Sequence, residues 1–193
     1  MFIKEDAMKK LFAVLMCAVM TISMSACSKK SETGKGAENI ARISPETLLS
    51  AETVSGMTGA SMVMSEDGVS VDGNGLSVTY VANPIGTADT VSVTVEQFSD
   101  TLGVSQVWSD YESNRITRSS DTEFVEGIGE DCYIAYPFIN VYVRGCYVRI
   151  SAGSGNNDSQ KNLLMSLAAN AAVTIEQQIP AEAVDTGADN VIK

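Results

Sequence analysis

The sequence predicts an α+β fold, in which one antiparallel β-sheet has two or three helices packed on one face. Alternating apolar and polar residues predict short strands between residues 61 and 98 and again over 131–152. Apolar residues recur with helical spacing over 104–118 and 157–175. Because short turns join most of the strands, antiparallel pairing is favoured.

The first part of the domain begins with two helix-start signals. Proline is favoured at the first helical position and serine at the cap, so Pro45 and Ser50 both indicate the start of a helix, and one short helix is predicted over 51–58. Gly59 is expected to end this helix, because glycine adopts a positive φ without strain. Turn-forming residues then separate the predicted strands, which cover 61–65, 69–71, 76–82 and 90–98.

Two longer helices are predicted in the second part of the domain. The first covers 104–118, and Trp108 is its expected anchor in the core. The glycine-containing stretch 123–131 is predicted to be a turn that leads into the central strands. The last helix starts at a predicted capping box and ends near Ile175.

The stretch 131–152 is the densest β-forming segment of the chain. Successive side chains of a strand point to opposite faces, so alternation divides this stretch into two sets. One set is apolar: Cys132, Ile134, Val141, Val143, Cys146, Val148 and Ile150. The opposite set is aromatic and cationic: Tyr133, Tyr142, Arg144, Tyr147 and Arg149. Arg144–Gly145 is predicted to be a hairpin turn.

Composition excludes several classes of function. The chain has 193 residues and a net charge of -11, which disfavours nucleic acid as a partner because both molecules are anionic. It contains no histidine, so catalytic triads and metal sites that need histidine are excluded. We expect no cofactor, no metal site and no catalytic residue.

The N-terminus has the features of an export signal. Lys9 and Lys10 precede the apolar run 11–22, which is too short to span a bilayer comfortably, and Met8 is a plausible true start. The sequence Met-Ser-Ala-Cys that ends at Cys27 resembles the lipobox of bacterial lipoproteins, although methionine replaces the usual leucine. This resemblance implies that Cys27 is lipidated and anchors the chain in the cell membrane, facing the extracytoplasmic side.

This interpretation divides the chain into four parts. They are a signal peptide at 1–26, the lipidated cysteine with a flexible tether at 27–42, a single α+β domain at 43–176 and a disordered tail at 177–193.

The domain also resembles small lipoproteins of unknown function that have a PsbP-like sandwich. The resemblance covers about residues 44–176. It is based on the early S-x-E-T-V-x-x-M-T-G helix, the turn at 125–131, the Arg144–Gly145 hairpin and the alanine-rich last helix. It implies a sandwich fold, and the family supplies no catalytic residues.

The tyrosines and arginines of the 131–152 stretch are the candidate binding site. If their face is open, they could bind a protein or a small molecule, because aromatic and arginine side chains dominate binding hot spots. Cover by a helix or by the tail is the alternative. A non-enzymatic binding or accessory lipoprotein is therefore the leading hypothesis. A structural envelope lipoprotein and a hydrolase that uses Glu126, Glu130 and Asp131 are the alternatives.

Cys132 and Cys146 are the only cysteines that follow Cys27, and export favours a disulfide between them. One long return strand after a turn at 138–139 would place the two cysteines opposite each other. A second turn at Arg144–Gly145 would instead leave them one strand too far apart.

Overall fold

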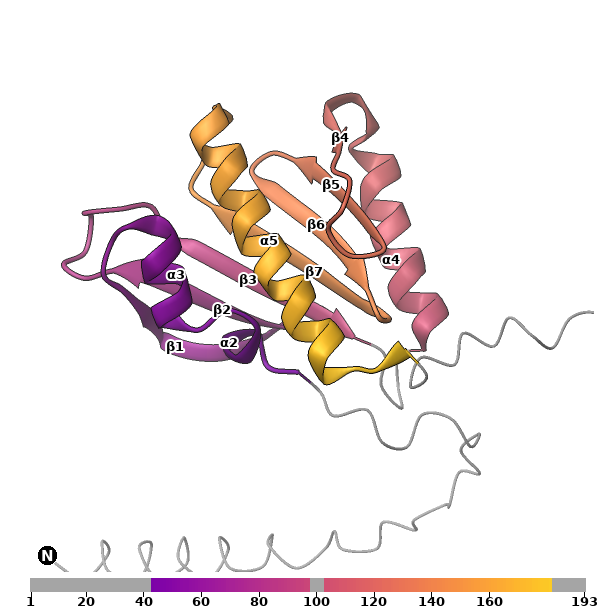
Figure 1. The fold of residues 1–193 in the computed structure, drawn as a ribbon, viewed down its shortest axis with the longest axis horizontal. Helices are drawn as coiled ribbons and strands as arrows, with labels where there is room; N and C mark the ends of the chain where they lie inside the picture. Colours follow the sequence, from indigo (N-terminus) through magenta and orange to yellow (C-terminus); the bar gives the residue numbers. More distant parts are fainter. Residues whose placement is uncertain (1–42, 98–102, 182–193) are drawn as a thin grey trace, which may run out of the picture. The chain divides into compact units, whose positions relative to one another are not determined.

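The computed structural model describes residues 43–97 and 103–181 (Figure 1). The predicted signal peptide, the lipidated cysteine and the tether lie outside the described residues, as does the segment 182–193 of the predicted tail.

The described residues form a seven-stranded sheet with the strand order β1-β2-β3-β7-β6-β5-β4, in which every neighbouring pair is antiparallel. The strands are β1 (Met62–Asp72), β2 (Gly75–Ala82), β3 (Val91–Gln97), β4 (Glu123–Phe124), β5 (Asp131–Ala135), β6 (Phe138–Val143) and β7 (Cys146–Ala152). Two meanders, β1 to β3 and β4 to β7, meet where β3 pairs with β7. The chain therefore crosses from the middle of the sheet to its far edge between β3 and β4.

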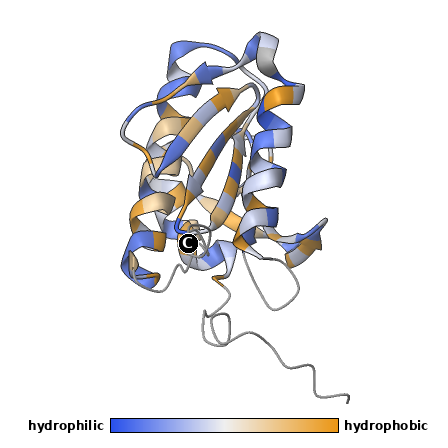
Figure 2. Cartoon of the chain, turned by 90° about the vertical axis from the view of Figure 1, so that its right-hand side faces the viewer, coloured by the Kyte–Doolittle hydropathy of each residue, from blue (hydrophilic) through white to orange (hydrophobic). Residues whose placement is uncertain are grey.

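Helices cover both faces of the sheet (Figures 1 and 2). They are α2 (Pro45–Leu48), α3 (Ala51–Thr58), α4 (Val104–Thr117), the 3-10 turn η1 (Ser119–Asp121) and α5 (Asp158–Gln178). Helices α2, α3 and α5 pack on one face, so the predicted α+β fold is confirmed. Helix α4 forms the crossover on the opposite face, whereas the fold prediction placed all helices on one face.

The local signals that start and stop α3 act as predicted. The Ser50 hydroxyl accepts a hydrogen bond from the Thr53 backbone N–H at 3.2 Å, and Gly59 ends the helix at a φ of 70°. The Ser55 hydroxyl oxygen accepts a bond of 2.8 Å from the Met62 backbone N–H, which joins the helix to the start of β1.

Three boundaries differ from the sequence prediction. The two strands predicted at 61–65 and 69–71 are replaced by one strand, β1, which begins at Met62 and whose pairing with β2 shifts at an irregularity between Met64 and Val69. The predicted turn at 123–131 begins with the short strand β4. Helix α5 continues to Gln178, and Ile179 is buried, because the apolar stripe of the helix still meets the core at that point.

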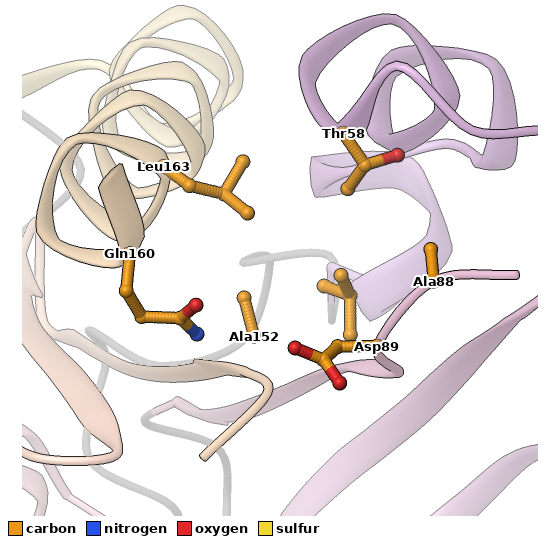
Figure 3. Close-up of a pocket in the computed structure, with 7 residues that line it drawn as sticks. Thr58, Ala88, Asp89, Ala152, Gln160 and Leu163 are labelled. Carbon is orange, nitrogen blue, oxygen red and sulfur yellow. The ribbon is translucent and has the colours of Figure 1, made fainter. Parts of the chain in front are cut away.

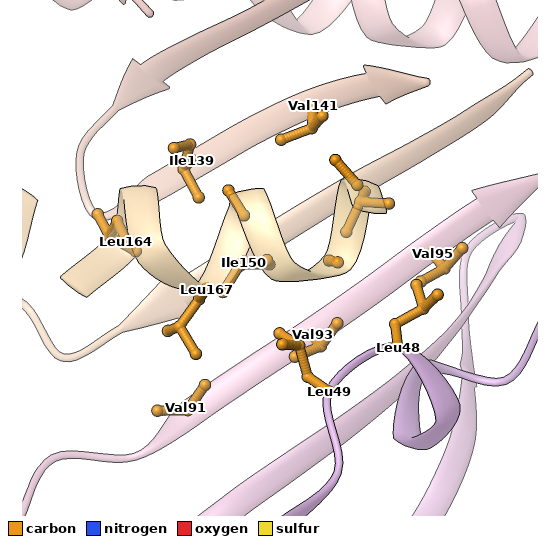
Figure 4. Close-up of a cluster of buried hydrophobic side chains, with 14 of the residues drawn as sticks. Leu48, Leu49, Val91, Val93, Val95, Ile139, Val141, Ile150, Leu164 and Leu167 are labelled. Atoms are coloured by element: carbon orange, nitrogen blue, oxygen red, sulfur yellow. The ribbon is translucent and has the colours of Figure 1, made fainter. Parts of the chain in front are cut away.

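The main core lies between the sheet and helices α2, α3 and α5. Figure 4 shows leucines of α2 and α5 packed against valines and isoleucines of the central strands. Fully buried members include Leu49, Val93, Val95, Ile139, Ile150, Leu164 and Leu167. Full burial of one such side chain contributes about 1.5–3 kcal/mol, so this layer holds the helices on the sheet.

Candidate functional site

The tyrosines of the predicted binding face are part of a second core beneath α4. The exposed fractions of Tyr133, Tyr142 and Tyr147 are 0%, 7% and 4%. Tyr111 of α4 lies among them, with ring centroid distances of 5.2 Å, 5.8 Å and 5.4 Å respectively. The prediction that this face is open is therefore wrong, and the alternative, cover by a helix, is correct.

The anchor of α4 is Tyr111 and not Trp108. Tyr111 is 0% exposed, whereas Trp108 is only partly buried and places its ring 4.8 Å from that of Tyr142 at the margin of the cluster. Helical spacing identified the correct side of the helix, but it could not rank two aromatic residues three positions apart.

The Tyr147 hydroxyl takes part in two side-chain hydrogen bonds. The Tyr147 O–H donates to Asn140 Oδ1 at 2.8 Å and accepts from Asn114 Nδ2 of α4. Burial raises the pKa of Tyr147 and raises the pKa of Tyr142 to about 12. Both phenols therefore stay neutral at physiological pH, and the Tyr147 hydroxyl joins Asn114 of α4 to Asn140 of the sheet.

The two arginines do not join the tyrosines in a single patch. Arg144 occupies the hairpin turn at a φ of 49°, and its backbone N–H donates to Glu130 Oε1 at 3.0 Å. Arg149 forms an ion pair of 3.3 Å with Asp72, and its guanidinium lies 5.2 Å from the centroid of the Phe138 ring. Each arginine supports local structure at the edge of the buried cluster.

Cys132 and Cys146 are free and buried, so the predicted disulfide is wrong. Cys132 lies on β5 opposite Val141 of β6, and Cys146 lies on β7 opposite Val143 of β6. Because β6 separates the two thiols, they are about two strand spacings, roughly 10 Å, apart. Burial raises the pKa of each thiol to about 12, which makes both unreactive.

The carboxylates of the hydrolase hypothesis are not brought together. Glu130 accepts the Arg144 backbone N–H, Asp131 lies 3.6 Å from Arg115, and Glu126 is exposed. Among the described residues no group of three histidine, cysteine, aspartate or glutamate side chains could hold a metal ion.

A pocket that sequence reasoning missed lies between α3 and α5, at the end of the sheet where β3 begins and β7 ends. Its volume is about 200 Å³, and Figure 3 shows side chains from both helices and both strand ends around it. They include Thr58, Ala88, Asp89, Ala152, Gln160 and Leu163.

Two polar groups of this pocket have no partner in the part of the chain that the structure describes. The Nε2 atom of Gln160 is buried and makes no hydrogen bond, and the exposed Asp89 forms no ion pair. Gly153, at a φ of 75°, lies so close to Asp89 that a Cβ there would be 2.3 Å from Asp89 Oδ2. The positive φ favours glycine at this turn, and any larger residue would also displace the Asp89 side chain.

The residues of the pocket come from segments far apart in the sequence, so no motif marks them. The glycine-rich stretch after β7 was the only local signal, since glycines often mark a close approach of two segments. A second hollow of about 150 Å³, beside Arg115, Ile116, Thr122 and Phe124, contains no unpartnered polar group among those four residues.

Comparisons with family models, with curated proteins and with solved structures find no match. The resemblances to lipoproteins therefore stay predictions. No helix within the described ranges is both long enough and apolar enough to cross a membrane.

Proposed function

We propose that this protein is a lipid-anchored extracytoplasmic binding protein, whose domain holds a small ligand in the pocket between α3 and α5 without converting it chemically. The observation that carries the proposal is the pocket itself, a hollow of about 200 Å³ in which apolar walls such as Leu163 and Val91 lie beside the polar side chains of Asp89 and Gln160.

The N-terminal sequence supports the anchor. Acylation of Cys27 would hold the chain in the bilayer, and the polar, glycine-containing stretch 28–42 would act as the tether. A flexible tether of this length spans about 20 Å on average, so the binding domain would stay near the membrane surface.

The anchor is tested by the Cys27→Ala substitution in cells fed a labelled fatty acid. We expect the label to be lost and the protein to leave the membrane fraction. Label that still enters the variant would show that another residue, or none, carries the lipid.

The binding role is tested with two tryptophan variants on α5. Leu163→Trp fills the pocket, whereas Val173→Trp adds the same side chain at a position that is 50% exposed. Each full-length chain is purified after incubation with a metabolite extract of the producing cells, and bound compounds are identified by mass spectrometry. We expect a compound that is retained by the wild type and by Val173→Trp and lost from Leu163→Trp. If all three proteins retain the same compounds, or none, the binding function is wrong and a purely structural lipoprotein is favoured.

A further inference from the structure

We propose that Asn74 is a site of spontaneous deamidation, and that its conversion to a carboxylate weakens the contact between the β1–β2 hairpin and α4. The proposal does not depend on the proposed binding function. It is argued from the sequence at the tip of the hairpin, the exposure of Asn74 and the charges around it.

The Asn74–Gly75 sequence supplies the reacting groups. Gly73 and Asn74 are the turn residues between β1 and β2, and Gly73 has a φ of 59°, as the first central residue of a type II′ turn does. The chain contains no other asparagine that is followed by glycine. Glycine hinders the reaction least, because it has no side chain to shield its own backbone nitrogen. Asn74 is exposed, so water reaches its side chain.

The reaction needs water as its only co-reactant. The backbone nitrogen of Gly75 bonds to Cγ of Asn74, the C–N bond of the side-chain amide breaks, and the amide leaves as ammonia with the proton from Gly75. This step forms a succinimide ring. Water then adds to a ring carbonyl and breaks its bond to the ring nitrogen. Depending on the carbonyl attacked, the product is aspartate or isoaspartate, and no group is oxidised or reduced.

The product would carry its negative charge into a group of carboxylates. The Asn74 amide donates to Asp110 Oδ2 of α4 at 3.4 Å, and an ionised aspartate has no proton to donate there. Asp72 lies across the turn, where it pairs with Gly75. Glu96 lies beside the same glycine, since a Cβ added to Gly75 would be 3.0 Å from Glu96 Cγ.

Arg149 compensates only part of this charge. Its guanidinium pairs with Asp72 at 3.3 Å and lies near Glu96, so Asp72, Glu96 and Asp110 surround one arginine. A further carboxylate at position 74 would replace the hydrogen bond to α4 with repulsion, and salt would screen that repulsion because the site is exposed. Isoaspartate would also lengthen the main chain at the turn and disturb the pairing that closes the hairpin.

Incubation of the purified full-length chain in detergent micelles tests the modification. The chain is kept at mildly alkaline pH, where the backbone nitrogen loses its proton more readily. Samples are digested at acidic pH and analysed by mass spectrometry. We expect Asn74 to be converted before any other asparagine, to a mixture of aspartate and isoaspartate. Asn74→Gln should be far more stable at this position, because its longer side chain closes a larger ring. If Asn74 stays intact, or reacts no faster than the other asparagines, the site assignment is wrong.

The structural effect is tested with Asn74→Asp, which gives the aspartate product without incubation. At low salt, we expect the backbone amides of α4 around Asp110 to exchange with solvent about two- to fivefold faster than in the wild type, the usual effect of one exposed charge pair. Asn162→Asp is the matched control, because it makes the same change at an exposed position of α5, on the other side of the sheet, and should leave this exchange unchanged.

A second substitution assigns the effect to charge. Asp110→Asn, added to Asn74→Asp, should restore the exchange of the wild type, because the amide at position 110 can donate to the new carboxylate. High salt should reduce the effect of Asn74→Asp alone. Unchanged exchange in Asn74→Asp would overturn the structural part of the proposal. An increase that persists both in the double variant and at high salt would also overturn it, since repulsion from Asp110 would then not be the cause.

Discussion

Removal of the Tyr147 hydroxyl tests whether hydrogen bonds, as well as aromatic packing, hold α4 on the sheet. Tyr147→Phe keeps the ring and leaves Asn140 Oδ1 and Asn114 Nδ2 without the hydroxyl between them. Asn140 is 2% exposed, so water cannot replace the lost donor, and such an unpaired buried group costs about 1–3 kcal/mol. Asn114 is only partly buried and can turn to water. We expect a loss of about 2 kcal/mol in the free energy of unfolding.

Tyr111→Phe is the matched control within the same cluster. The Tyr111 hydroxyl is buried and has no hydrogen-bond partner among the described residues. Its removal takes away an unpaired polar group and leaves the ring contacts unchanged. We therefore expect the free energy of unfolding to stay the same or to rise slightly.

Urea unfolding of the full-length chain, followed by tryptophan fluorescence, measures both variants, because Trp108 lies at the margin of the cluster. For a slope of about 2 kcal/mol per M, the midpoint of Tyr147→Phe should fall by about 1 M. The reasoning fails if that midpoint stays within the error of the wild type, or if Tyr111→Phe falls by as much.

Three further predictions concern a helix, the thiols and a carboxyl group. Gly56→Ala should raise the free energy of unfolding by about 0.5–1 kcal/mol in the same urea assay, because Gly56 lies in α3 with no atom within 4 Å of an added Cβ; a decrease would contradict this. Cys132 and Cys146 should resist alkylation in the native chain and react fully in denaturant without reductant; failure to react when unfolded would indicate a disulfide. Burial raises the pKa of Glu96 in the folded state, and the nearby Asp110 raises it further. The folded state therefore favours protonated Glu96. This contribution to stability is complete below the pKa of the unfolded chain and is lost as the pH rises through the pKa of the folded chain. Glu96→Gln should therefore have the higher melting temperature at pH 7 and no advantage below about pH 4, where the carboxyl is protonated in both states; equal advantage at both pH values would refute this.

Local signals predicted the elements that depend on a few neighbouring residues. Ser50 and Gly59 fixed the ends of α3, because a cap and a left-handed residue act within one helical turn. Arg144 and Gly145, both at positive φ, form the turn between β6 and β7 as predicted. The same turn made the disulfide impossible, since it places Cys146 on a third strand. The predicted turn and the predicted disulfide were incompatible, and it is the turn that forms.

The pocket could not be predicted, because it depends on contacts between distant segments and not on local signals. Thr58, Asp89 and Gln160 belong to a helix end, a loop and the first turn of another helix, and each has an ordinary local role. Only the pairing of β3 with β7, together with the packing of α3 against α5, brings them together. Strand pairing between distant segments depends on the whole topology, which periodicity within a short window does not contain.

The burial of the tyrosine face, by contrast, could have been inferred from the residue types on the two halves of the sheet. On the side of the sheet that carries α4, strands β5 to β7 present tyrosines, each of which buries about 150–250 Å² when covered. On the same side, strands β1 to β3 present small hydroxyl residues such as Ser70, Ser77 and Ser92, and the first two form a hydrogen bond of 3.0 Å. These residues are exposed or only partly buried. Several neighbouring tyrosines need a cover that serines do not, so the amphipathic crossover helix lies over the tyrosine half of the face.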